Sequence, residues 1–124
     1  MIPELSDHEL TQALGRTPGR RERQAAGEVI WFDDDRVLLA DLAVPGAGAG
    51  AVFDGLLDAA ARVGHLTMVL DEPPVRVIVV DGALPGSRQA VAADGRAVLT
   101  LVLPRGFPAG AEIAAARLLA DRLQ

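Results

Sequence analysis

The sequence predicts an α/β (α+β) fold in which helices cover both faces of a mostly antiparallel, five-stranded sheet. The strongest evidence lies near the C-terminus. Asp94-Gly95 separates two β-prone runs, which is among the strongest short-range signals for a hairpin. The following strand, residues 97–103, is almost continuously apolar, as is typical of a strand covered on both faces. An amphipathic helix over residues 109–123 supplies one of those covers.

The N-terminal segment predicts a short helix followed by a basic loop. Ser6 and Glu9 form a capping box, so we expect a helix from Asp7 to about Leu14 that stops at Gly15. The arginine-rich segment that follows, residues 16–23, has two interpretations: a solvated connection, or a docking surface for an acidic partner or a phosphate.

A hairpin is expected next, with strands over residues 28–32 and 36–42. The turn between them contains three consecutive aspartates, Asp33 to Asp35. Adjacent carboxylates in a tight turn point apart, and no further acidic residue follows at the spacing of a calcium loop. The sequence therefore predicts a solvated turn here and no metal site.

The middle of the chain leaves one choice open. Apolar residues recur at helical spacing from Ala51 to about Leu70, but Gly64 lies within this stretch. Either one long helix runs through it, or a helix ends near Arg62 and a strand covers residues 66–70. Further strands are expected over residues 75–80 and 89–92. The resulting order of elements is α-β-β-α-β-β-β-α.

Length and composition indicate one domain of 124 residues, with an N-terminal helix and basic loop (1–27) and a core (28–124). The absence of cysteine excludes disulfides and thiolate chemistry. The net charge of −5 disfavours binding to nucleic acid. No signal-peptide pattern is present, and no apolar run approaches the roughly 20 residues that span a bilayer. We therefore expect a cytoplasmic protein without membrane insertion.

A glycine-rich segment is the main candidate for a cofactor site. Gly46 and Gly48 follow an apolar strand and precede a helix, and Asp71 ends a candidate second strand. This pattern imitates the dinucleotide fingerprint, in which glycines let the backbone approach a pyrophosphate. Pro45 interrupts the expected junction, and the preceding hairpin makes the neighbouring strands antiparallel. We therefore expect no cofactor. The alternative is a degenerate nucleotide- or cofactor-binding α/β domain that would bind its ligand through the Gly46–Ala51 loop.

Other catalytic arrangements are weakly supported. His8 and His65 lie in separate elements with no third ligand spaced to join them, so no metal site is expected. Ser6 is better explained as a helix cap. Asp54 and Asp58 share a helix face and would suit acid–base chemistry only if buried together. The sequence thus indicates a protein that is not an enzyme.

The order of elements and three stretches of sequence resemble the roadblock family of small α/β modules, which is related to the dynein light chains. Residues 72–79 are similar to the family's passage from its long helix into the central strand. Residues 94–103 resemble its last hairpin and strand, and residues 106–123 its final helix. The turn at residues 34–36 departs from the family pattern, which has Asp-Gly there.

The resemblance implies a profilin/roadblock-like fold and a homodimer whose sheets join edge to edge through Val75, Val77 and Val79. Apolar excess in this strand independently favours self-association. The resemblance also implies that the central helices form a platform for a partner, for which we name the exposed candidates Asp58, Arg62 and His65. That partner would be a small Ras-like GTPase or a related signalling protein, which the chain would regulate or scaffold without an active site of its own.

Residues 5–10 also resemble the start of pterin carbinolamine dehydratases, whose order is α-β-β-α-β-β-α. Those enzymes carry two adjacent histidines followed by proline after the central helix. Here only His65 is present, followed by Leu66. This second resemblance implies a catalytically dead protein.

Overall fold

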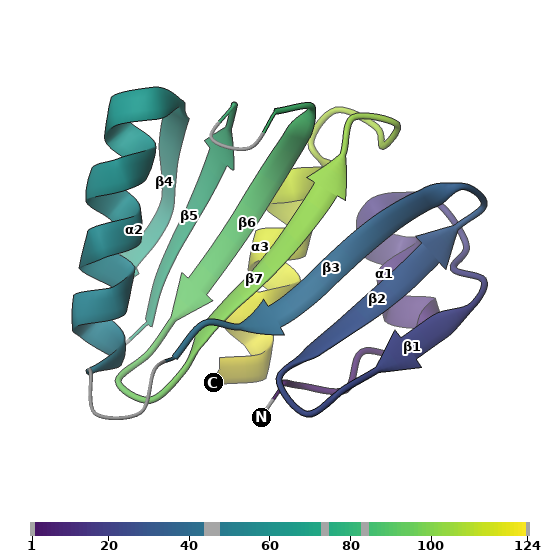
Figure 1. Cartoon of the computed structure of the whole chain (residues 1–124), viewed down its shortest axis with the longest axis horizontal. Helices are drawn as coiled ribbons and strands as arrows, with labels where there is room; N and C mark the ends of the chain where they lie inside the picture. The colour runs from purple at the N-terminus through teal and green to yellow at the C-terminus, as the bar shows by residue number, and fades with distance from the viewer. Residues whose placement is uncertain (1, 44–47, 73–74, 83–84, 124) are drawn as a thin grey trace.

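The computed structural model describes residues 2–43, 48–72, 75–82 and 85–123. Within them, seven strands form one sheet, and every neighbouring pair of strands is antiparallel. The strand order is β1-β2-β3-β7-β6-β5-β4 (Figure 1). In chain order the elements are α1 (Asp7–Leu14), β1 (Arg21–Arg23), β2 (Gly27–Phe32), β3 (Asp35–Asp41), α2 (Ala49–Val63), β4 (His65–Glu72), β5 (Val75–Asp81), β6 (Ser87–Ala93), β7 (Val98–Pro104) and α3 (Ala111–Leu123).

The mixed α+β class and the helices on both sides of the sheet are confirmed, but the expected count of five strands is wrong. The two additional strands are β1, within the segment expected to be a basic loop, and β4. At β4 the second of the two interpretations is correct. Gly64 caps α2 with an extended backbone, and its N–H donates to the carbonyl of Ala60 at 3.0 Å. The chain then continues directly as a strand.

One face of the sheet is covered by α1 and α3, which lie behind it in Figure 1. Alternate residues of the strands point to this side, because successive side chains of a strand face opposite ways. Leu39, Leu101 and Val77 are fully buried there, in the same hydrophobic cluster as Ala116 and Leu119 of α3. This side holds the larger of the two hydrophobic clusters.

The opposite face carries α2, which lies in front of the sheet beside β4 (Figure 1). Phe53 of α2 is fully buried and packs in a smaller cluster with Ile78 of β5, Val91 of β6 and Val98 of β7. One helix covers this face, and it sits toward the β4 side. The two faces of the sheet are therefore unequally covered.

The N-terminal helix forms as its capping box predicts. The Ser6 hydroxyl accepts from the N–H of Glu9, and the Glu9 carboxylate accepts from the N–H of Ser6, both at 3.1 Å. Gly15 ends the helix in the left-handed region, with φ of 75°. Leu10 and Leu14 are buried in the main cluster. The N-terminal segment therefore belongs to the core, which does not begin at residue 28 as expected.

No helix within the described part of the chain has the length and apolar character that crossing a bilayer requires.

Candidate interaction surface

The predicted dimer edge is wrong, because β5 lies inside the sheet. Its residues pair with β4 on one side and with β6 on the other. Val75, Val77 and Val79 are buried, with 4%, 0% and 6% of their surface exposed, and they pack in the main cluster. The free edges of the sheet are β1 and β4 instead. The reason is that residues 66–70 fit both helical and strand spacing, so the sequence alone does not show that β4 covers the outer side of β5.

The three residues predicted to contact a partner are all exposed. Asp58 and Arg62 lie one turn apart on α2, and His65 begins β4. Asp54, one turn earlier, instead pairs with Arg76 at 2.8 Å. The structure leaves the three positions accessible, and their role in binding stays a prediction.

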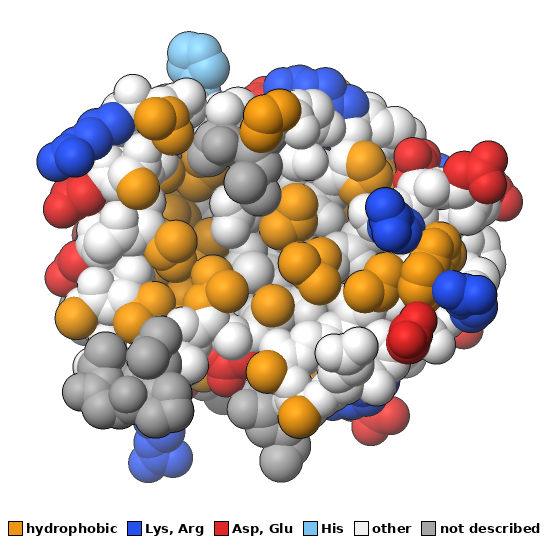
Figure 2. Space-filling view, in the orientation of Figure 1, with side chains coloured by type: hydrophobic (Ala, Val, Ile, Leu, Met, Phe, Trp, Pro, Cys, Tyr) orange, Lys and Arg blue, Asp and Glu red, His pale blue; other side chains and the backbone are white. Residues whose placement is uncertain are grey.

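A second exposed feature was missed in the sequence: an apolar row that crosses the half of the sheet beyond α2. Val29 of β2 lies opposite Leu38 of β3, and Leu38 lies opposite Val102 of β7. Leu38 is 43% exposed, whereas its chain neighbours Val37 and Leu39 are fully buried on the other face. Figure 2 shows hydrophobic side chains gathered across the middle of this face. We call Val29, Leu38 and Val102 the apolar row.

The apolar row continues toward α2 into a shallow groove. Gln89 lies opposite Val102, and Val80 lies opposite Gln89. The groove has a volume of about 270 Å³ and lies between part of α2 and the sheet. Its lining consists of Leu56, Ala59, Ala60 and Val63 of α2, with Ile78, Val80, Gln89 and Val91 of the sheet. The row and the groove thus form one continuous, mainly apolar surface.

The opposite end of the apolar row is cationic and aromatic. Trp31 of β2 lies opposite Arg36 of β3. Each is two residues from Val29 or Leu38 along its strand, so both point to the same face as the apolar row. The guanidinium of Arg20 stacks 4.0 Å from the centre of the Trp31 ring. Arg36 is exposed and forms no ion pair with any residue that the structure describes. Tryptophan and arginine are the residue types most enriched among the energetically dominant contacts of protein interfaces.

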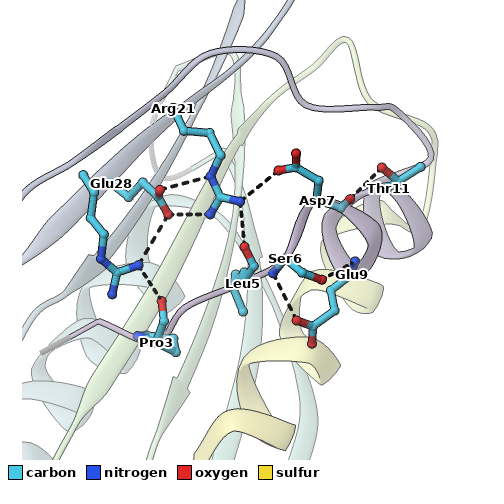
Figure 3. Close-up of polar contacts among 9 residues, drawn as sticks. Pro3, Leu5, Ser6, Asp7, Glu9, Thr11, Arg21 and Glu28 are labelled. Carbon is cyan, nitrogen blue, oxygen red and sulfur yellow. Dashed lines mark hydrogen bonds and ion pairs between the residues drawn. The ribbon is translucent and has the colours of Figure 1, made fainter.

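The arginine-rich segment 16–23 is only partly a solvated loop, because residues 21–23 form β1 and two of its arginines make internal contacts. Its role as a docking surface stays a prediction. Arg21 donates to both carboxylate oxygens of Glu28, at 3.0 and 2.7 Å, and to the carbonyl of Leu5 at 2.7 Å (Figure 3). Glu28 is only 4% exposed, and this pairing raises the pKa of Arg21. Arg16 binds Asp35 at 2.7 Å and stacks on Phe107. Among these arginines, Arg20 remains largely exposed.

The alternative cofactor site lacks its structural context. Gly46 lies outside the described residues, and Gly48 caps the N-terminus of α2. A dinucleotide fold needs β3 and β4 to be neighbouring parallel strands, but β7, β6 and β5 lie between them. Asp71 pairs with Arg76 at 3.3 Å.

The other catalytic candidates are also dispersed. His8 lies in α1 and His65 in β4, and both are exposed. Ser6 caps α1, and Asp54 and Asp58 are exposed and so do not form a buried carboxylate pair. Across the described residues, no group of three histidine, aspartate or glutamate side chains is placed to hold a metal ion. The observed element order also contains more strands than the pterin dehydratase order.

Comparison with protein-family models, curated proteins and solved structures finds no match for this chain.

Proposed function

We propose that this chain is a non-enzymatic interaction module that binds a protein partner through the apolar row and the adjoining groove. The observation that carries the proposal is the exposure of Leu38 in the middle of a sheet face on which α2 covers only one side. A contiguous apolar surface rimmed by polar groups is typical of a protein-binding site, whereas single exposed hydrophobic residues are ordinary.

The chemistry of this surface favours a particular kind of partner contact. Apolar side chains of the partner would cover Val29, Leu38 and Val102, and a partner carboxylate would pair with Arg36. Because Arg36 has no ion-pair partner among the described residues, a carboxylate can bind it without breaking an existing contact. The stacked pair of Arg20 and Trp31 adds a rigid aromatic surface beside it.

We propose that the partner is a small Ras-like GTPase or a related signalling protein, which this chain would regulate or scaffold. Support for this class comes from the roadblock resemblance of residues 72–79 and 94–103. Asp58 and Arg62 on α2 and His65 at the start of β4 are exposed but do not line the groove, and we propose them as additional contacts for such a partner. The reaction chemistry would then belong to the partner.

The test is a binding titration against purified small Ras-like GTPases from the same genome, each loaded with GDP or with a non-hydrolysable GTP analogue. We expect one of them to bind the wild type and Leu38→Asp to weaken that binding at least tenfold, about 1.4 kcal/mol. Ile113→Asp is the matched control, because Ile113 is 38% exposed but lies on α3, behind the other face.

Equal loss of binding in both variants, or no loss in either, would overturn the proposed surface. A panel in which no GTPase binds the wild type would overturn the proposed partner class. Circular dichroism of both variants establishes that the substitutions leave the fold intact.

A further inference from the structure

The segment that precedes α1, residues 2–6, belongs to no helix or strand and is held in place by side chains. We call it the strap. Ile2 and Leu5 are 2% and 0% exposed, and both lie in the main hydrophobic cluster. Pro3, between them, has no N–H with which it could pair with a strand. Two apolar side chains, three residues apart, therefore seat the strap in an apolar cleft.

Two arginines of β1 bind the carbonyl groups of the strap. Arg21 donates to the carbonyl of Leu5 at 2.7 Å (Figure 3). Arg23 donates to the carbonyl of Ile2 at 2.8 Å and to that of Pro3 at 3.4 Å. Every residue carries a backbone carbonyl, so these contacts do not depend on the strap's own sequence. They suit any extended segment that brings two apolar side chains at the same spacing.

The two arginines are held in position by a buried carboxylate and not by the strap. Glu28 of β2, 4% exposed, accepts from Arg21 at 3.0 and 2.7 Å and lies 3.9 Å from Arg23. A bidentate, charge-assisted pair fixes a guanidinium more firmly than a neutral hydrogen bond does. The carbonyl-binding groups are therefore preorganised, which lowers the cost of binding a new segment.

The strap leaves part of its surroundings unfilled. A cavity of about 470 Å³ lies beside it, and its lining includes Glu4 and Leu5 of the strap together with Arg21, Arg23 and Glu28. Packing at this place does not restrict the cleft to the strap's own side chains, because a bulkier segment has room to enter.

We propose that the strap is a displaceable occupant of a peptide-binding cleft, and that an extended segment of another protein binds there in its place. The incoming segment carries two apolar side chains three residues apart, as Ile2 and Leu5 are, and offers its carbonyls to Arg21 and Arg23. The strap restrains this binding, because its attachment to the chain gives it an effective concentration of about millimolar. The cleft opens on the main cluster beneath α1 and α3, whereas the apolar row lies on the other face, so this proposal does not depend on the proposed function.

The first test measures how readily the strap opens in the whole chain. The chain has no cysteine, so a single introduced thiol reports its own exposure. We expect a maleimide to label Leu5→Cys at least about a hundredfold faster than Leu10→Cys, because the strap opens locally while α1 stays in place. Leu10 is the matched control, since it is equally buried in the same cluster but lies on α1. Equal labelling rates in the two variants, both shown to be folded by circular dichroism, would overturn the proposal.

The role of the arginines is tested in the same Leu5→Cys background. Arg23→Gln should raise the labelling rate about fivefold, because it removes two hydrogen bonds to the strap. Arg20→Gln is its control and should leave the rate unchanged, since Arg20 stacks on Trp31. Equal rates in these two variants would contradict the role given to Arg23.

The second test asks whether the cleft accepts a segment from outside. The probe is the acetylated and amidated peptide Ile-Pro-Glu-Leu-Ser, which has the sequence of the strap, added at millimolar concentrations to Leu5→Cys. We expect it to accelerate labelling in a saturable manner, because it occupies the cleft and keeps the strap displaced. The same peptide with aspartate in place of its leucine should have no effect. Failure of the first peptide to accelerate labelling, or equal acceleration by both peptides, would overturn the proposal.

Discussion

The two faces of this sheet are made from similar residues but are covered to different extents. Leu38 and Leu39 are neighbours in β3, yet Leu39 is fully buried beneath the helix layer and Leu38 is 43% exposed. Two helices cover the first face, whereas the second has only α2, placed beside β4 (Figure 1). The difference shows that alternation along a strand assigns residues to faces but does not say how far each face is covered.

The largest expected effect is a difference in stability loss between alanine substitutions on the two faces of the sheet. Leu39→Ala should lower the free energy of unfolding by about 3 kcal/mol, because it leaves a cavity in the covered cluster. Leu38→Ala, one residue away, should lower it by less than about 1 kcal/mol, because solvent already reaches this side chain. Urea denaturation of both variants measures the contrast. Equal losses would mean that Leu38 is packed as tightly as Leu39 and would break the comparison.

A buried ion pair on the covered side gives the next effect. Glu28→Gln removes the charge that Arg21 contacts through two hydrogen bonds, so we expect a loss of roughly 2 kcal/mol, smaller than for a fully buried pair because Arg21 is partly exposed. Glu22→Gln is the control, since Glu22 is exposed and its contact with Arg20 is 4.0 Å long. The measurement is again urea denaturation. If Glu28→Gln left the free energy of unfolding unchanged, packing and not this ion pair would hold the N-terminal segment in place.

The smallest effect concerns pH. The backbone N–H of Ser6, followed by Arg122, holds the pKa of Glu9 below its ordinary value of about 4.3. Because the folded pKa is the lower one, this contribution is complete above the ordinary value and is lost as pH falls through the folded pKa. The wild type should therefore lose more stability than Glu9→Gln on acidification below about pH 4. Thermal unfolding at several pH values tests this, and parallel curves would contradict it.

Most of the elements could be predicted because local signals agreed. The capping box at Ser6 and Glu9, the turn at Asp33 and the Asp94-Gly95 hairpin each fix a short stretch of backbone without help from distant residues. β1 could not be found in this way. Its sequence, Arg-Glu-Arg, has no apolar alternation, and it forms a strand because β2 offers it an edge. Its arginines then donate to carbonyls that are distant in the sequence, such as those of Leu5 and Ile2.

The candidate site was predicted only in part, for a related reason. Asp58, Arg62 and His65 are exposed as expected, since their charges mark the outer side of α2 and the start of β4. The sequence predicts β5 at the edge of the sheet, because this segment is strongly β-forming and more apolar than one small core requires. Its partner is β4, a stretch with equal helix and strand character in the sequence. The apolar row could not be predicted, because the exposure of its side chains depends on which part of the sheet face α2 covers.

The strand order also determines how the chain must fold. β4, β5, β6 and β7 form a meander of consecutive hairpins, and β1, β2 and β3 form another. The two meanders join where β3 pairs with β7, with Leu38 opposite Val102. This contact closes a long loop that contains α2 and three strands, β4, β5 and β6. Since closing long loops slows folding more than forming local hairpins does, we expect this junction to form late. Until it forms, the inner edges of β3 and β7 are themselves open.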